Sequence, residues 1–291
     1  MPERPVPPRR PEFVRDTVAE RDFGVVAQPL TGWERLAGHS AVRKLLLLAL
    51  LAAAWQAYAA WLGNPLVLPT FAETLKAFMQ RTLSGEMVGK AAVSITVLLK
   101  GYAIGLAGAL LLSILATTTR LGQDLLETLT AMLNPLPAIA LLPLALMWLG
   151  LGEPSIVFVL VHSVMWPVAL NTYSGFQAVS NTLRMVGRNY GLTGPRYVLQ
   201  ILVPAAFPSI LAGLKVGWAF AWRTLIAAEL VFGTTSQSGG LGWFIYENKN
   251  VLDIPAVFAG LFTVILIGLV VEGLIFRSLE KATVQKWGMQ A

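Results

Sequence analysis

Long apolar segments separated by short polar stretches fill most of the chain after residue 42. A helix that crosses a bilayer needs about 20 predominantly apolar residues. Six segments meet that requirement, at about residues 45–62, 87–118, 129–149, 155–176, 204–232 and 255–276. The pattern therefore predicts an all-α membrane protein with about six transmembrane helices.

Two of these segments carry residues that shape a helix bundle. The segment 129–149 contains Pro135, Pro137 and Pro143. Each proline removes a backbone hydrogen bond, so we expect a kinked or broken helix shielded by protein neighbours. The segment 87–118 offers a small-residue face that permits close helix packing, formed by Gly101, Gly105 and Gly108.

Charge is scarce and its placement predicts the topology. Only 13% of the residues are charged, against about 25% in soluble proteins. Lysine and arginine gather before the first segment, in the loop 177–203 and after the last segment, and basic residues mark the cytoplasmic side. We expect a cytoplasmic tail at 1–42, a transmembrane domain at 43–278 with a cytoplasmic loop at 177–203, and a cytoplasmic tail at 279–291. Both termini would then lie on the cytoplasmic side of the membrane.

The sequence lacks the residues and motifs that several classes of catalytic and metal-binding sites require. The chain has no cysteine and two histidines, too few for a thiolate or histidine-based metal site. It has no phosphate-binding loop, nucleophile motif or zinc-binding spacing. We therefore expect no catalytic residue, no metal site and no cofactor in this chain. The net charge of +6 suits a protein oriented by basic loops rather than one that binds nucleic acid.

The most informative polar segment begins at residue 183. It predicts a short helix, a glycine break, a second short helix and a proline that opens the next span, because proline is favoured at a helix start. Such a basic, glycine-hinged elbow can dock into another protein, whereas the alternative is an ordinary cytoplasmic loop. The candidate docking residues are Arg188, Gly191, Pro195, Arg196 and Pro204.

This segment resembles the EAA loop of binding-protein-dependent ABC importer permeases, whose pattern is E-A-A, three residues, G, nine residues and I-x-x-P. Gly191, Ile201 and Pro204 keep that spacing, whereas residues 185–187 read M-V-G, so the acid and the first alanine are absent. The resemblance extends over about residues 55–287 and is closest to the taurine, sulfonate, nitrate and bicarbonate branch. The stretches that carry it are PLPAIALLPLALMWLGLGE (135–153), ILVPAAFPSILAGLKVG (201–217), TLIAAELVF (224–232) and GGLGWFI (239–245).

The resemblance implies a type I ABC importer permease fold and a role as the membrane-spanning subunit for a small anionic solute. It implies cytoplasmic ATPase subunits that bind ATP and magnesium, an external substrate-binding protein and a second permease copy, for which we expect a homodimer. The elbow around Gly191 would be the coupling helix that sits in a groove of the ATPase. The resemblance also implies a multi-pass protein of a bacterial inner membrane, with membrane lipids around its transmembrane helices.

Ionisable residues within a span are costly, so each is a candidate for the substrate pathway. Arg223 and Glu229 lie six residues apart, about 240° around a helix, and do not face each other. Arg223 suits an anionic substrate, or is a structural arginine that snorkels or pairs with an acid. Glu229 would pair with a neighbouring helix. His162 and Trp166 share a helix face and would line the passage; the alternative is a buried, hydrogen-bonded histidine packed beside Trp166.

Two other classes of protein compete with this interpretation. A secondary transporter driven by an ion gradient usually has internal repeats and about ten to twelve spans, and this chain shows neither. A structural or assembly protein of the membrane is the third possibility. An ATPase that co-purifies with the chain would favour the importer.

Overall fold

The computed structural model describes residues 39–232, 239–286 and 288. Within these ranges the regular structure is entirely helical. The chain divides into two units, residues 1–51 and 52–291, and each is considered by itself. The first unit contributes the start of α2 (Ser40–Leu62). Most of the predicted tail 1–42 lies outside the described residues.

Five of the described helices are long and apolar enough to cross a membrane. They are α2, α4 (Glu86–Thr118), α7 (Glu153–Ala178), α11 (Phe207–Phe232) and a continuous helix through α13 (Ile254–Val270), η3 (Val271–Phe276), α14 (Arg277–Glu280) and η4 (Lys281–Gln285). A sixth crossing is available from a bent pair, α5 (Arg120–Leu133) followed by η1 (Ala138–Leu141) and α6 (Leu142–Leu149), with an angle of 89° between its halves. The prediction of an all-α protein with about six spans is confirmed.

The third span differs most from its prediction. The sequence predicted that the second span ends near residue 118 and that a kinked or broken helix covers about 129–149. Instead α5 begins directly after Thr119, whose hydroxyl accepts a hydrogen bond from the Gly122 N–H at 2.9 Å and caps the helix. The break falls between Leu133 and Ala138, where Pro135 and Pro137 cannot donate backbone hydrogen bonds.

Two other span boundaries also differ. Pro204 was expected to open the fifth span, but it lies in α10 (Val203–Ala205), and α11 starts at Phe207. A proline is tolerated in the first turn of a helix because its missing N–H would have no helical partner there. The proline in the first turn of α11 is therefore Pro208, not Pro204. The last helix continues to Gln285, beyond the expected end of the transmembrane domain at 278.

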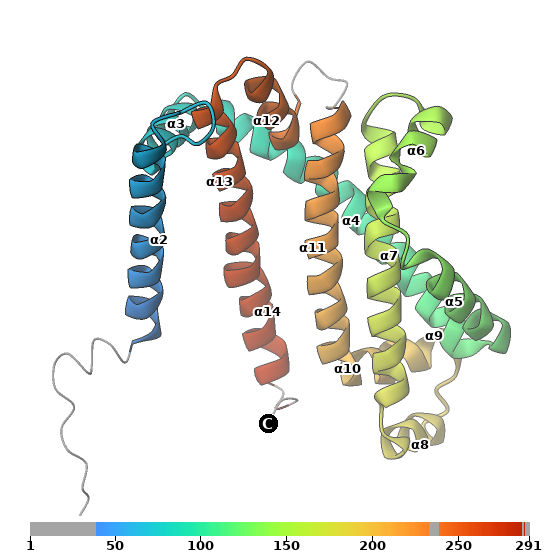
Figure 1. The fold of residues 1–291 in the computed structure, drawn as a ribbon. Helices are drawn as coiled ribbons and strands as arrows, with labels where there is room; N and C mark the ends of the chain where they lie inside the picture. The colour runs from blue at the N-terminus through green and yellow to red at the C-terminus, as the bar shows by residue number, and fades with distance from the viewer. Residues whose placement is uncertain (1–38, 233–238, 287, 289–291) are drawn as a thin grey trace, which may run out of the picture. The chain divides into compact units, whose positions relative to one another are not determined.

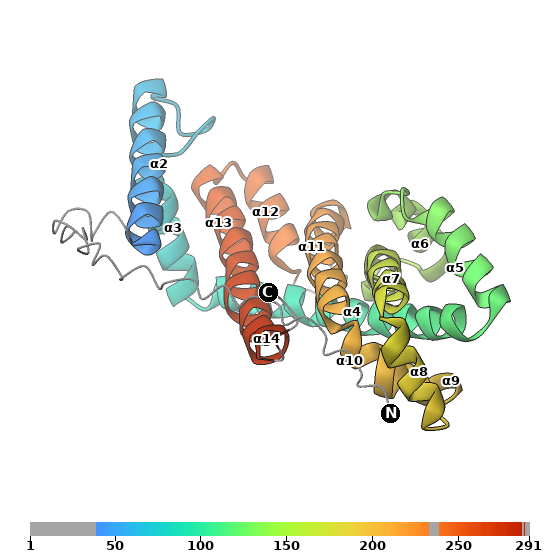
Figure 2. The same ribbon diagram turned by 90° about the horizontal axis from the view of Figure 1, so that it is seen from below.

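The core of the second unit is formed where α4, α7 and α11 pack together. Glycines on α4 allow the approach: a Cβ added at Gly101 would lie 2.5 Å from the Leu160 Cβ, and one added at Gly105 would lie 2.8 Å from the Val164 Cβ. The predicted small-residue face is thus confirmed, with α7 as its partner. Figures 1 and 2 both show α11 between α7 and α13.

Short helices cap the two ends of these long helices. At one end lie α8 (Asn181–Asn189), α9 (Gly194–Tyr197) and α10, and at the other lie α3 (Phe71–Leu83), α6 and α12 (Leu241–Asn250) (Figure 1). The amphipathic helix α3 begins with a capping box between Thr70 and Glu73. The hydrogen bonds that Thr70 donates from its backbone N–H and its hydroxyl lower the pKa of the Glu73 carboxyl.

Candidate functional site

A cavity of about 340 Å³ opens where the break between α5 and η1 meets α7 and α11. Arg223, His162 and Trp166, which the sequence suggested as pathway residues, all line it. The break supplies one wall, because residues 134–139 follow no regular α-helix and leave room between the longer helices. The structure therefore brings three of the four predicted pathway residues into one place.

The aromatic pair on α7 lines this cavity and contains buried polar atoms that have no hydrogen-bond partner within the described residues. The rings of His162 and Trp166 meet edge to face, with centroids 6.0 Å apart, and the Trp166 side chain is buried, at 4% exposure. Neither ring nitrogen of His162 nor the indole nitrogen of Trp166 has a hydrogen-bond partner among the described residues. Buried polar atoms are nearly always satisfied in folded proteins, so these atoms call for water or a ligand.

Arg223 provides the positive charge of the cavity. Its side chain is exposed, its guanidinium carbon lies 5.3 Å from the ring centroid of Phe220, and its Nε donates to the Ala219 carbonyl at 3.1 Å. No ion pair to Arg223 occurs within the described residues, and the lining residues include no aspartate or glutamate. A planar guanidinium without a carboxylate partner is suited to bind an oxyanion with two parallel hydrogen bonds.

Glu229 does not share this cavity. Its side chain is fully buried, and its carboxylate accepts hydrogen bonds from the Ser94 hydroxyl at 2.7 and 2.8 Å and from the Gly242 N–H at 2.9 Å. The Ser94 oxygen in turn accepts from the Leu241 N–H at 2.9 Å. These contacts join α11, α4 and the N-terminus of α12, where a negative charge is favoured by the helix dipole. A Cβ at Gly240 would collide with both the Glu229 carboxylate and the Ser94 hydroxyl.

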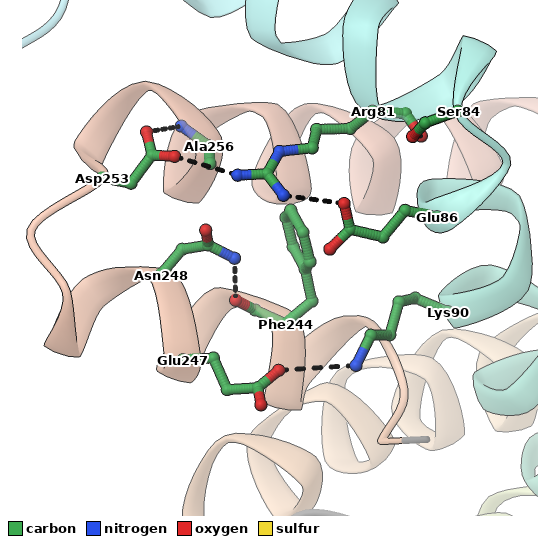
Figure 3. Close-up of polar contacts among 9 residues, drawn as sticks. All are labelled: Arg81, Ser84, Glu86, Lys90, Phe244, Glu247, Asn248, Asp253 and Ala256. Atoms are coloured by element: carbon green, nitrogen blue, oxygen red, sulfur yellow. Dashed lines mark hydrogen bonds and ion pairs between the residues drawn. The ribbon is translucent and has the colours of Figure 1, made fainter. Parts of the chain in front are cut away.

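Ion pairs also connect α12 and the segment that follows it to the neighbouring helices α3 and α4 (Figure 3). Arg81 of α3 contacts the carboxylates of Glu86 at 2.7 Å and Asp253 at 3.1 Å, and its guanidinium lies over the Phe244 ring. Lys90 of α4 pairs with Glu247 of α12 at 3.4 Å. The close-up shows these groups converging from α3, α4 and α12, so this end of the protein is tied together by charge.

The elbow residues lie at the opposite end of the long helices. Arg188, Gly191, Pro195 and Arg196 are exposed around the junction of α8 and α9, while Pro204 lies further along in α10. Gly191 ends α8 in a left-handed conformation, with φ of +71°, as a glycine at this position of a helix commonly does.

The elbow is firmly attached to the bundle but exposes apolar side chains. The Arg184 guanidinium donates to the carbonyls of Phe176 at 2.6 Å and Val179 at 3.1 Å, and a Cβ at Gly187 would lie 2.9 Å from the Tyr197 ring. Met185 is nonetheless 57% exposed and Tyr190 81% exposed. Apolar side chains presented on a rigid polar elbow are typical of a protein-docking surface.

The sequence interpretation missed several residues that line the cavities. Asn134, Phe220 and Thr224 also line the Arg223 cavity, and a second cavity beside it is lined by Thr130 and Tyr173 among others. Spacing along α7 was the available signal, because residues 162, 166, 170 and 173 fall on one helix face. No group of three or more histidine, aspartate or glutamate side chains that could hold a metal occurs in the described part of the chain.

Comparison with known proteins gives a consistent family assignment. The profile of the binding-protein-dependent transport system inner membrane component family matches residues 109–282. A Methanocaldococcus jannaschii chain assigned as an ABC transporter permease is 32% identical over 235 residues, which are 79% of this chain and 87% of that one. A Bacillus subtilis chain assigned as an aliphatic sulfonates transport permease is 30% identical over 84% of this chain and 87% of its own length.

The nitrate import permease protein of Synechocystis sp. is also 30% identical, over 79% of this chain and 85% of its own length. The family match begins in the last third of α4, at residue 109, and covers the core helices that follow, including the cavity-lining and elbow segments. The chain therefore belongs to the binding-protein-dependent transport system inner membrane component family and is an integral, multi-pass permease component of the inner membrane.

Proposed function

We propose that this chain forms the membrane passage of an ATP-driven importer for a small oxyanion, such as a sulfonate or nitrate. The observation that carries the proposal is the cavity in which Arg223 lies beside the unpartnered nitrogens of His162 and Trp166. In the described part of the cavity wall no carboxylate competes for the guanidinium. Relatives named for aliphatic sulfonate and for nitrate transport support an anionic substrate.

The elbow supports a division of labour with partner subunits. The exposed surface around Arg188 and Gly191 would dock into a cytoplasmic ATPase, which binds ATP and magnesium and performs the hydrolysis. This end would face the cytoplasm, since basic residues mark that side and Arg184, Arg188 and Arg196 lie there. Both termini would then be cytoplasmic, and the end formed by α3, α6 and α12 would receive substrate from an external binding protein.

A second copy of the chain would complete the passage. Arg223 and Phe220 are exposed on the surface of a single protomer, so the cavity has an open side that a partner protomer would close. Closed two-fold pairs are the commonest soluble assemblies, and a homodimer needs no second gene product. Closure matters for the chemistry because a cation acts far more strongly on an anion when water is excluded.

The test is ATP-driven uptake of labelled nitrate and ethanesulfonate by proteoliposomes that hold the chain with its ATPase and binding protein. Arg223→Ala should abolish most uptake while the yield of assembled complex stays unchanged. Arg223→Lys should retain part of the uptake, because lysine keeps the positive charge but lacks the planar guanidinium. Arg120→Ala is a matched control, since Arg120 is exposed at the start of α5 and lies outside the cavity.

Two results would contradict the proposal. Normal uptake by Arg223→Ala would remove the residue from the passage. Loss of assembled complex in that variant would instead assign Arg223 a structural role, because an acid on a partner would then be left without its counter-charge.

A further inference from the structure

A second cavity of about 390 Å³ continues the Arg223 cavity toward the elbow end of the bundle. The two cavities share Asn134 and Pro135 at the break after α5. Along α7 the first cavity is lined by Trp166 and the second by Tyr173, seven residues or about 10 Å further along the helix. Because α7 runs from the α6 end to α8, the second cavity lies on the elbow side of the first.

Unsatisfied polar atoms concentrate along these two cavities. The described residues contain eight buried side-chain atoms without a hydrogen-bond partner, and five of them belong to Thr130, His162, Trp166 and Tyr173. Thr130 is 7% exposed and Tyr173 is 8% exposed, yet the hydroxyl of neither is bonded. Burying such groups without partners is unfavourable. Because all four residues line the two cavities, a polar ligand that enters the cavities would supply partners for these groups.

We propose that Thr130, Asn134 and Tyr173 form a second station for the same oxyanion, on the way from Arg223 to the cytoplasm. The inference rests on the proposed function and adds a route and a set of residues to it. Hydroxyl and amide groups donate hydrogen bonds, which suits an oxyanion, because an oxyanion can only accept them. The station has no fixed positive charge in its described lining.

The absence of a cation in the second station suits release. A passage must bind its substrate well enough to admit it and weakly enough to let it leave, which several weak sites achieve better than one strong site. Glu127 lines the second cavity, two helical turns before Asn134, and its carboxylate accepts from the Gln123 amide at 2.9 Å. Its negative charge discourages an anion from resting at that end, so the anion moves on to water.

The experiment removes one hydroxyl at a time from the reconstituted complex and measures anion transported per ATP hydrolysed. Tyr173→Phe and Thr130→Val keep the shape of each side chain, and each should lower the ratio about tenfold, since a hydrogen bond to a charged group is lost. Thr130→Ser restores the hydroxyl and should recover the ratio. Thr74→Val is the matched control, because the buried Thr74 hydroxyl is also unpartnered but lies on α3, outside both cavities.

Ratios that stay at the wild-type value in both Tyr173→Phe and Thr130→Val, while Arg223→Ala still loses uptake, would overturn the second station and leave the proposed function standing. Equal losses in Thr74→Val would also overturn it, since the effect would then follow from any buried hydroxyl. If the wild-type complex takes up neither nitrate nor ethanesulfonate with ATP, the proposed function fails and this inference fails with it.

Discussion

Replacing Glu229 with alanine should release α12 from the bundle. The carboxylate is the only group within the described residues that accepts from both the Ser94 hydroxyl of α4 and the Gly242 N–H of α12. Because the Ser94 hydroxyl and the Gly242 N–H both donate to it, this side chain links α4 to the start of α12. Without it, the Gly242 N–H and the Ser94 hydroxyl proton lose their acceptor, and only the bond from the Leu241 N–H to the Ser94 oxygen remains.

The size of the effect follows from these contacts. Hydrogen bonds to a charged group contribute about 1.5–3 kcal/mol each, and a charge at a helix N-terminus adds about 0.3–1 kcal/mol. Part of this loss is offset because the alanine variant no longer has to bury a polar carboxyl group. The net cost of removing one partner from a buried charged network is typically about 3–5 kcal/mol. At about 2–4 °C per kcal/mol for a chain of this size, the melting temperature should fall by roughly 6–20 °C.

Thermal unfolding of the purified protein in detergent measures this, followed by size-exclusion chromatography of the heated samples. Glu229→Gln is the control, because it keeps the shape and one acceptor oxygen and should cause a smaller fall. A second readout uses the absence of native cysteine: Ile245→Cys places a thiol on the buried face of α12. That thiol should resist labelling alone and react when Glu229→Ala is added.

The reasoning would be refuted by a Glu229→Ala protein that melts within 2 °C of wild type, well below the fall expected from loss of a buried charged partner. A thiol at position 245 that stays protected in that variant would refute it equally, since α12 would then be held by other contacts.

Three further predictions concern the elbow, the helix packing and the outer ion pairs. Gly191→Val should lower ATPase co-purification and uptake, because a φ of +71° costs a branched residue about 1–2 kcal/mol, whereas Gly191→Asn should retain both. Gly105→Leu should lower the melting temperature by several degrees, since its Cβ would meet Val164 at 2.8 Å, while Gly89→Leu, with open space around it, should not. Arg81→Ala should cost only about 1 kcal/mol, in a salt-dependent way, because the Arg81 side chain is 34% exposed.

Each of these has a clear contrary result. Equal co-purification in the valine and asparagine variants at position 191 would show that the left-handed turn is not required for docking. Equal melting temperatures for Gly89→Leu and Gly105→Leu would show that the close contact between α4 and α7 at Gly105 does not contribute to stability. A salt-independent loss in Arg81→Ala would point to packing against Phe244 rather than charge.

The long apolar segments and the elbow could be predicted from sequence because each depends on local pattern. About 20 apolar residues define a span wherever it packs, and glycine spacing on α4 predicted a close neighbour without naming α7. The turn at Gly191 was likewise visible as a break between two short helices. The third span was harder, since Pro135 and Pro137 indicate a break but not which flanking residues continue as helix.

Contacts between distant segments could not be predicted in this way. Nothing in the sequence around Ser94 indicates that its hydroxyl bonds to a carboxylate 135 residues later. The separate environments of Arg223 and Glu229 follow from their angle on α11, but which helices face each side depends on the tertiary fold. Asn134 and Tyr173 were missed because neither places a charge within a span, and their position beside the same cavity depends on the tertiary fold.

The central claim is that this chain conducts an anion at the expense of ATP. It is tested most directly by loading proteoliposomes that hold the complete complex with ATP, in the absence of any ion gradient, and measuring the entry of labelled nitrate and ethanesulfonate. The account predicts accumulation of at least one of these anions that requires ATP and is lost in Arg223→Ala. Accumulation that occurs only with an imposed ion gradient, or that persists unchanged in Arg223→Ala, would contradict it.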